Sequence, residues 1–582
     1  MKKICLFIAL LLPFVAFADN ITADKAQSYA AKFLGAQLRT ATRTVRLVSD
    51  SEKMTAAKKL EMPAYYIFNA NGGGFVIISA EDAVSPVLAY SYDNTFEVEG
   101  MPDNVAYWMD QLRTEILKVR ESKAKASPKV KAEWEMLAST GITPSYASDE
   151  MKLETALWNQ SSPFNDLCPT VGGKNAPSGC VATATGIVMR YHKWPEAGHG
   201  TLPDYEYADG SGKTQKGHKL GHTYDWDNMP LTYKSGQYTP EQAAQVAQLL
   251  YDVGIMAHMM YYSGSSGTVT AWIAAGLEKY MYYDPSIIYE AKGTYSNDQW
   301  LDKIKKELKE VGPVVYDGQS SSGGHAFVID GYDKSNKVSV NWGWGGNSNG
   351  YFDIASMNGF SSRCGAIFNM KPEKGGKSPD TAISYYDVYI KDDYIVPDKQ
   401  FKVYIGTLET LYRDGAIDIA IGHFDAKGKL KKVISEIERL EEGDLPVGYY
   451  TTSPSSFDEC IIKEKPASGD YLQPIYRVKE KDPFVPAIFN SEENGHKTIT
   501  LDLPVINCTS MEYDANDKLV TLTTNIDGKP SFTLKNSRGT AVKDGVSTSG
   551  NSFIIDRKVV PSGQYTVSIT VDWSTQSFTF TL

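Results

Sequence analysis

The sequence changes character after a junction rich in Gly, Lys and Pro at residues 374–379. Before it, runs with helical periodicity mix with short apolar runs. After it, residues 381–582 show short alternating runs separated by turn residues, and helical patterns are scarce. About 100 residues of this alternation are typical of one β-sandwich. We therefore expect an α+β part followed by two all-β sandwich domains, at 380–490 and 491–582.

The first 18 residues have the pattern of a signal peptide. Lys2 and Lys3 precede an apolar run, and Ala16-Phe17-Ala18 forms a cleavage signal ahead of Asp19. The apolar run is too short for a transmembrane anchor. We therefore expect an exported protein that does not span a membrane: secreted, periplasmic or held at the cell surface.

The net charge and the number of cysteines exclude some classes of protein. The 59 basic and 70 acidic residues give a net charge of −11 with no large basic block, which argues against nucleic acid as a partner. Beyond the signal peptide there are five cysteines: Cys168, Cys180, Cys364, Cys460 and Cys508. This number is odd and small for an exported chain of 582 residues, so we expect no disulfide framework and at least one unpaired thiol.

Residues 19–145 carry enough apolar pattern for a small domain of their own. We expect helices at 23–38 and 104–119 and two short strands at 65–68 and 74–78. The charged run 118–131 predicts a solvated helix face and linker, and 138–149 predicts an exposed, protease-sensitive linker.

Residues 146–374 mix both periodicities, which predicts an α+β domain. The expected helices cover 180–192, 240–253, 269–280 and 297–310, and the expected strands include 314–316, 326–329 and 338–341.

Cys180 stands at the predicted start of a helix whose early positions are small. Free N–H groups and the partial positive charge at a helix N-terminus favour a thiolate over a thiol. Taken alone, the residue could equally be a buried, inert cysteine.

Three further positions strengthen the catalytic interpretation of Cys180. His325 follows two glycines and lies 145 residues after the cysteine, within the roughly 130–150 typical of papain-like peptidases. Asn341, followed by Trp342, could hold the imidazole tautomer that faces the thiol. Gln160, 20 residues before the cysteine, could donate to an oxyanion. Each of these has an ordinary structural alternative, but together they predict a thiol-dependent hydrolase.

A metal site is not expected. His218 and His222 have the i, i+4 spacing of a metal pair, but Gly217, Lys219 and Gly221 predict a loop there, and no HExxH motif is present. We therefore expect no metal and no organic cofactor.

The segments 179–192 and 323–346 resemble those of the streptopain family of secreted papain-like cysteine peptidases, peptidase family C10. The similarity extends through 252–255 and 265–267, and segments 73–79 and 86–91 resemble the family's propeptide. The resemblance implies a papain-like core at 146–374 and an inhibitory propeptide at 19–145, cut within about 136–152. The last 200 or so residues resemble immunoglobulin-like appendages of related enzymes.

The resemblance also implies the roles of individual residues. Cys180 is the expected nucleophile, His325 its proton acceptor and Gln160 the oxyanion donor, with Asn341 and Trp342 supporting the imidazole. Gly324, Ser266, Gly267 and Thr268 match substrate-cleft positions.

The sequence therefore predicts a secreted cysteine endopeptidase made as a zymogen, acting on proteins or peptides and inhibited by its own propeptide. Two alternatives remain. One is a non-catalytic protease inhibitor or adhesin on a degenerate peptidase scaffold. The other is a secreted Cys–His amidase acting on cell-wall peptides.

Overall fold

The computed structural model describes residues 20–582 except 38–42, 55–61, 100, 102, 321–322, 354–363, 378–380, 393–394, 412–414, 442–449, 452–454, 491–494, 502, 504 and 527–529. The predicted signal peptide lies outside the described residues. The chain forms two compact units, one mainly of residues up to 380 and one mainly of those after it. Among the described residues, no helix has the length and apolar character needed to cross a lipid bilayer.

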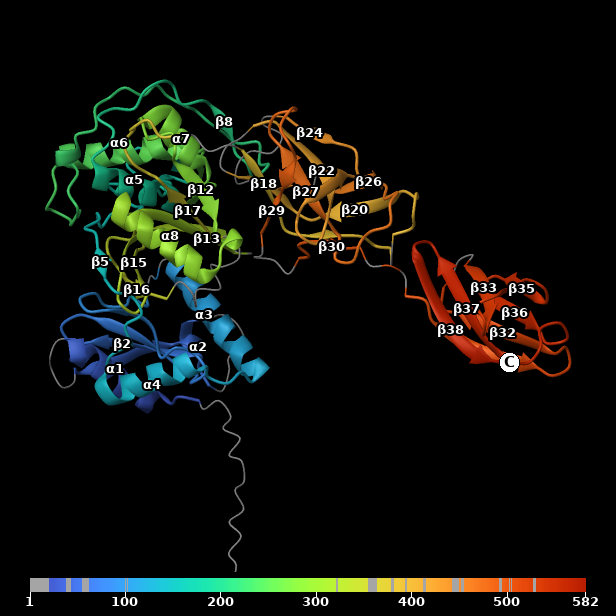
Figure 1. The fold of residues 1–582 in the computed structure, drawn as a ribbon. Helices are drawn as coiled ribbons and strands as arrows, with labels where there is room; N and C mark the ends of the chain where they lie inside the picture. Colours follow the sequence, from blue (N-terminus) through green and yellow to red (C-terminus); the bar gives the residue numbers. More distant parts are fainter. Residues whose placement is uncertain are drawn as a thin grey trace, which may run out of the picture. The chain divides into compact units, whose positions relative to one another are not determined.

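The first unit is built on one large antiparallel sheet (Figure 1). Its first four strands come from the N-terminal region: β1 (Val45–Asp50), β2 (Tyr65–Ala70), β3 (Phe75–Ser79) and β4 (Val87–Ser91). The sheet continues through β16 (Gly350–Phe352), β15 (Val338–Asn341), β14 (Gly323–Tyr332), β13 (Val314–Ser320), β17 (Gly365–Phe368) and β12 (Ile288–Ala291), with β5 (Met151–Lys152) beside β14.

The join between the two halves of this sheet is the pairing of β4 with β16. Tyr90 stands opposite Tyr351, and Ala89 opposite Phe352. The rings of Tyr90 and Tyr351 stack with centroids 5.1 Å apart. The N-terminal region and the later α+β region therefore share backbone hydrogen bonding across residues about 260 positions apart in the sequence.

Helices cover both faces of the sheet. On one face lie α5 (Cys180–His192), α6 (Pro240–Met256) and α7 (Trp272–Met281), packed in one core with Val315, Ala326 and Val328. On the other face lie α3 (Asp103–Ser122) and α8 (Asn297–Glu310), packed with the alternate residues Tyr316, Phe327 and Ile329. α1 (Ala23–Gln37) and α4 (Pro128–Thr140) enclose a further core of the N-terminal region.

The helix boundaries follow local sequence signals. Thr239 with Gln242, and Ser296 with Gln299, form capping boxes that start α6 and α8. The expected bounds match the observed ones at α5 and α8, and α6 runs three residues beyond its expected end.

The charged run 118–131 comprises the exposed end of α3 to Ser122, a short connection, and the start of α4 at Pro128 with Ser127 as its N-cap, as a solvated helix face and linker would require. One prediction about the N-terminal region is wrong in part. The predicted linker 138–149 is helical up to Thr140, and Gly141 closes α4 in a left-handed conformation with φ 74°. Its later part is tied down as well, since the N–H groups of Tyr146 and Ala147 both donate to the Lys334 carbonyl.

Short elements complete the first unit: α2 (Ser51–Met54), β6 (Thr170–Val171), β7 (Lys174–Asn175), β8 (Tyr205–Glu206), β9 (Thr214–Gln215), η1 (Trp226–Asn228), β10 (Met260–Tyr262), β11 (Ser265–Gly267) and η2 (Lys292–Thr294).

The second unit is all-β in its described residues. Its first part comprises β18 (Ala382–Tyr385), β19 (Val388–Tyr389), β20 (Phe401–Ile405), β21 (Leu408–Leu411), β22 (Ile417–Phe424), β23 (Leu430–Val433), β24 (Glu438–Leu440), β25 (Tyr450–Thr451), β26 (Ser456–Cys460), β27 (Tyr471–Arg477), β28 (Val485–Pro486), β29 (Ile488–Phe489) and β30 (Ile499–Thr500). Two four-stranded sheets follow: β31 (Cys508–Asp514), β32 (Leu519–Thr524), β36 (Ser552–Asp556) and β35 (Val546–Ser549); and β34 (Ala541–Val542), β33 (Ser531–Asn536), β37 (Gln564–Val571) and β38 (Ser574–Thr581). They enclose a separate core that contains Leu522, Phe553 and Val567.

Candidate active site

Cys180 is the first residue of α5. The preceding Gly179 has φ 89° and has no side chain that could cap the helix. The first backbone N–H groups of α5 therefore point into the space in front of the helix. From Val181 to Met189 the helix is buried, and Gly186 brings it close to α6, since a Cβ there would lie 2.4 Å from Leu250 Cδ2. The helix start is therefore held firmly in the core.

His325 and Ala326 bring β14 to the start of this helix. The Ala326 backbone N–H donates to Cys180 Sγ at 3.4 Å. His325 is the third residue of β14, two positions inside the strand rather than at its predicted start. Gly318 of β13 stands opposite it, so no side chain crowds the imidazole from that neighbouring position.

Gln160, in the segment after β5, also lies beside the start of α5. The residue is 5% exposed, its N–H donates to Asn159 Oδ1, and its carbonyl accepts from the N–H of Ser178, two residues before the cysteine. The Gly345 N–H donates to the Trp158 carbonyl at 2.8 Å and ties the following loop to this segment.

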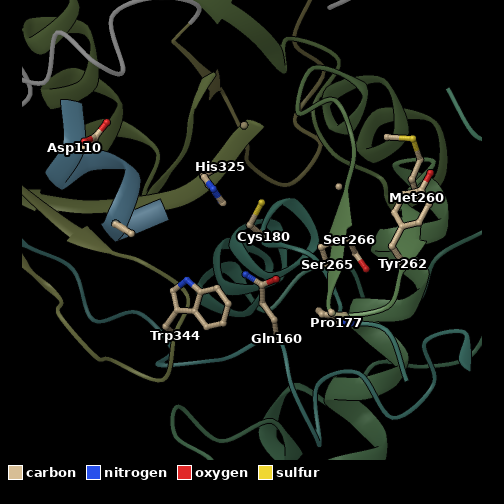
Figure 2. A pocket seen from close by; sticks show the side chains of 14 residues that line it. Asp110, Gln160, Pro177, Cys180, Met260, Tyr262, Ser265, Ser266, His325 and Trp344 are labelled. Atoms are coloured by element: carbon tan, nitrogen blue, oxygen red, sulfur yellow. The ribbon is translucent and has the colours of Figure 1, made fainter. Parts of the chain in front are cut away.

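These three side chains line one pocket of about 630 Å³ (Figure 2). Figure 2 shows the His325 imidazole, the Gln160 amide and the Trp344 ring arranged around the Cys180 thiol. The remaining lining residues are Ala106, Asp110, Pro177, Met260, Tyr262, Gly264, Ser265, Ser266, Gly267 and Gly324. The structure thus brings together residues that are far apart in the sequence, including three of the four predicted substrate positions.

Part of the pocket wall comes from the N-terminal region. Ala106 and Asp110 lie on α3 and line the cavity together with Cys180 and His325. In Figure 2 this helix, coloured blue, approaches the cavity from the side of His325.

The pKa of the Cys180 thiol is raised in this arrangement. Burial raises its pKa, and the backbone N–H groups of Ala326, Val181 and Cys180 itself oppose that rise without cancelling it. The N–H groups at the helix start therefore lower the pKa of the thiol, as expected, but desolvation has the larger effect.

Three predicted site residues do not line the pocket. Trp342 is 1% exposed and packs against Phe327 and Phe352 in the core on the opposite face of the sheet, together with Val338 and Val340. Trp344 follows a turn at Gly343, which has φ 74°, and lines the pocket instead. Strand alternation would place residues 342 and 344 on one face, so it could not have identified Trp344. The Thr268 hydroxyl donates to the Ala257 carbonyl.

Asn341 is also buried, and its amide is engaged in a local network. Its Nδ2 donates to Thr155 Oγ1 and to the Ala156 carbonyl, while its Oδ1 accepts from the Gly343 N–H. These bonds fix the segment that leads to Gln160 and the loop that carries Trp344. Its expected bond to the imidazole remains a prediction.

His218 and His222 meet at a buried carboxylate. The Nε2 atoms of both rings lie 2.7 Å from the Asp252 carboxylate, which also accepts from Tyr224 and Gln248. The described residues contain no cluster of three or more His, Cys, Asp or Glu side chains arranged to hold a metal ion.

Two family models match this chain. Residues 158–352, which contain Cys180, Gln160 and His325, match the model of the peptidase C10 family. Residues 18–116, which contain β1 to β4 and most of α3, match the model of the Spi protease inhibitor.

Individual relatives agree with these matches. The thiol protease/hemagglutinin PrtT of Porphyromonas gingivalis is 31% identical over 71% of this chain, which spans half of that protein's length. Prointerpain A of Prevotella intermedia, a solved structure, is 30% identical, with a TM-score of 0.47 over 57% of this chain and all of that one. Streptopain of Streptococcus pyogenes is 30% identical over 55% of this chain and 84% of streptopain. The chain therefore belongs to the peptidase C10 family of papain-like cysteine-type peptidases, as its sequence motifs predicted.

Proposed function

We propose that this protein is a cysteine endopeptidase, exported as a latent precursor, that hydrolyses peptide bonds in proteins or peptides. Cys180 is the nucleophile, His325 the general base and acid, and Gln160 the oxyanion donor. The observation that carries the proposal is the convergence of these three side chains, from α5, β14 and the segment after β5, on one pocket.

The chemistry follows from these positions. His325 accepts the thiol proton, and the Cys180 sulfur attacks the substrate carbonyl carbon. The Gln160 amide and the Cys180 N–H donate to the oxygen on which negative charge develops. His325 then gives its proton to the leaving amine as the C–N bond breaks. Water, deprotonated by the same imidazole, hydrolyses the thioester and restores the thiol.

The substrate lies against the loop 264–267 in this proposal. The Ser266 hydroxyl is buried in the pocket wall and has no hydrogen-bond partner within the described part of the chain, so it is available to a substrate backbone. Gly267 and Gly324 line the pocket without side chains, so a substrate backbone can approach closely at both positions. Thr268 supports the loop through Ala257, and Asn341 and Trp342 support it indirectly by fixing the strands beneath the site.

Latency arises from residues 19–145. α3 supplies part of the pocket wall, β4 extends the sheet of the peptidase region, and burial raises the pKa of the thiol. Covalent attachment gives this segment a high effective concentration, so modest intrinsic affinity suffices for inhibition. Cleavage within about 136–152 releases it; the accessible part is the non-helical stretch after Gly141, where Ser145 and Asp149 are exposed.

The test compares casein hydrolysis by the wild-type chain and by Cys180→Ala. We expect the wild type to process itself and hydrolyse casein in a manner blocked by iodoacetamide. The alanine variant should remain a single uncut precursor until a trace of active enzyme is added. Cys508→Ala is the matched control, because Cys508 is a free cysteine in the second unit.

Three outcomes would contradict the proposal. Casein hydrolysis by Cys180→Ala at the wild-type rate would exclude the thiol mechanism. A wild-type chain that is inactive even after removal of residues 19–145, yet inhibits a related peptidase, would favour the non-catalytic inhibitor. Cleavage of cell-wall peptides but not of casein would favour the amidase.

A further inference from the structure

Asp317 is a buried acid beside the site that the proposed chemistry does not use. It lies on β13 and is 4% exposed. Its partners are neutral donors from three other segments: the Tyr289 hydroxyl of β12 at 3.1 Å, the Thr270 hydroxyl before α7, and the Gly365 N–H of β17. A buried carboxyl with only neutral donors is costly to ionise.

The sheet register places Asp317 directly beneath the catalytic helix. Asp317 pairs with Ala326 across β13 and β14, so their side chains share a face of the sheet. That face carries Val315 and Ala326 in the same core as α5. Ala326 is also the residue whose N–H donates to the Cys180 sulfur.

Among the described residues, the titratable groups near Asp317 are Cys180 at the start of α5, Tyr289 of β12, and His325, which precedes Ala326 on β14. Burial raises the pKa of Asp317 to about 6, and its charge in turn contributes to the raised pKa of the Cys180 thiol. The acid is therefore already charged at the higher pH at which the Cys180 thiol titrates.

We propose that Asp317 is a positioning residue that controls, from beneath the site, the pH at which Cys180 ionises. Thr270, Tyr289 and Gly365 hold its carboxylate in place, and the negative charge disfavours a second negative charge on the sulfur. The importance of this role for catalysis rests on the proposed function. Its effect on the ionisation of the Cys180 thiol can be measured without any proteolysis.

The experiment measures the iodoacetamide alkylation rate of Cys180 against pH in the full-length chain, located by peptide mass spectrometry. All proteins carry His325→Ala so that the precursor stays intact. Asp317→Asn should lower the pH midpoint of alkylation by about one unit, which is about a tenfold faster rate at pH 7. Glu307→Gln is the matched control: Glu307 is a buried acid whose pKa burial raises to about 7, but it lies on α8, on the opposite face of the sheet.

A second measurement needs no substitution at Asp317. In the chain that retains it, the logarithm of the alkylation rate should show a shoulder near pH 6, where Asp317 gains its charge, and Asp317→Asn should remove that shoulder. The absence of the shoulder overturns the proposal even if Asp317→Asn fails to fold, which a thermal melt would reveal. A folded Asp317→Asn whose profile superimposes on its parent, or an equal shift in Glu307→Gln, overturns it as well. None of these results bears on whether Cys180 hydrolyses casein, so the two proposals can fail separately.

Discussion

The Tyr90 hydroxyl donates a 2.6 Å hydrogen bond to the Asp333 carboxylate, a buried contact between β4 of the N-terminal region and the turn after β14. Asp333 also accepts hydrogen bonds from the Ser335 hydroxyl and the Lys337 N–H. Its carboxylate is therefore held in position independently of Tyr90. The contact therefore reports directly on how the N-terminal region is docked.

Tyr90→Phe should weaken this docking, because it leaves a buried carboxylate short of one donor. A hydrogen bond to a charged group contributes about 1.5–3 kcal/mol, so inhibition of the mature enzyme by isolated residues 19–145 should weaken by about 10- to 100-fold. Tyr65→Phe is the control, because the Tyr65 hydroxyl donates to the Met109 carbonyl within the N-terminal region. Equal inhibition constants for Tyr90→Phe and the wild-type segment would contradict the docking role.

Gln160→Ala should reduce kcat by about 10²–10³-fold with a smaller change in KM, because an oxyanion donor acts mainly in the transition state. The measurement is steady-state hydrolysis of a chromogenic peptide. Gln237→Ala, at an exposed position before α6, should leave both constants unchanged. An unchanged kcat in Gln160→Ala would remove this residue from the site.

Gly179→Ala should reduce activity, because the added methyl group must displace the buried Met259 side chain that packs beside the start of α5. The position has φ 89°, and a Cβ would lie 2.6 Å from Met259 Cε. Gly173→Ala provides a matched control, since it has φ 83° and no atom within 4 Å of the added carbon. Both variants carry similar backbone strain, so peptidase activity retained in Gly173→Ala and reduced in Gly179→Ala isolates the effect of the contact. Comparable losses in the two variants would show that backbone strain alone is responsible.

His222→Gln should destabilise the protein in a pH-dependent way. The hydrogen bond to Asp252 raises the pKa of His222 above its unfolded value of 6.5. The stabilisation is therefore complete below about pH 6.5 and is lost as pH rises through the higher folded-state value. His222 is partly exposed, so we expect a modest loss in thermal midpoint, about 2–4 °C at pH 5.5 and little at pH 9. His199→Gln, at an exposed position, should show no such trend. A loss that grows with pH would contradict the assigned cause.

Local signals were sufficient to predict much of this fold. α8 has a capping box and a regular apolar stripe, and β15 is a short apolar run between turns, so both were predicted with their observed bounds. α4 was missed although Ser127, Pro128 and Gly141 are ordinary start and stop signals, because its charged residues obscured the apolar positions.

Long-range pairing was beyond local sequence patterns. Nothing near Tyr90 indicates that it will stand opposite Tyr351, because the pairing depends on the fold of the intervening chain. The position of Asp317 beside the site could not be predicted for the same reason. A single acid after an apolar run gives no sign of a role until the strand register places it opposite Ala326. Cys180, Gln160 and His325 could be predicted as a set because their chemistry, rather than their packing, restricts the residue types.

The pairing of β4 with β16 also determines what maturation leaves behind. In the proposed maturation, departure of the N-terminal region would leave the peptide groups of β16 without their β4 partners, and such an open sheet edge can recruit strands from other molecules. β16 has only three residues, Gly350–Phe352, so it offers very little length for another chain to pair with. A form that lost β1 to β4, four of the eleven strands, would therefore still be expected to resist edge-to-edge aggregation.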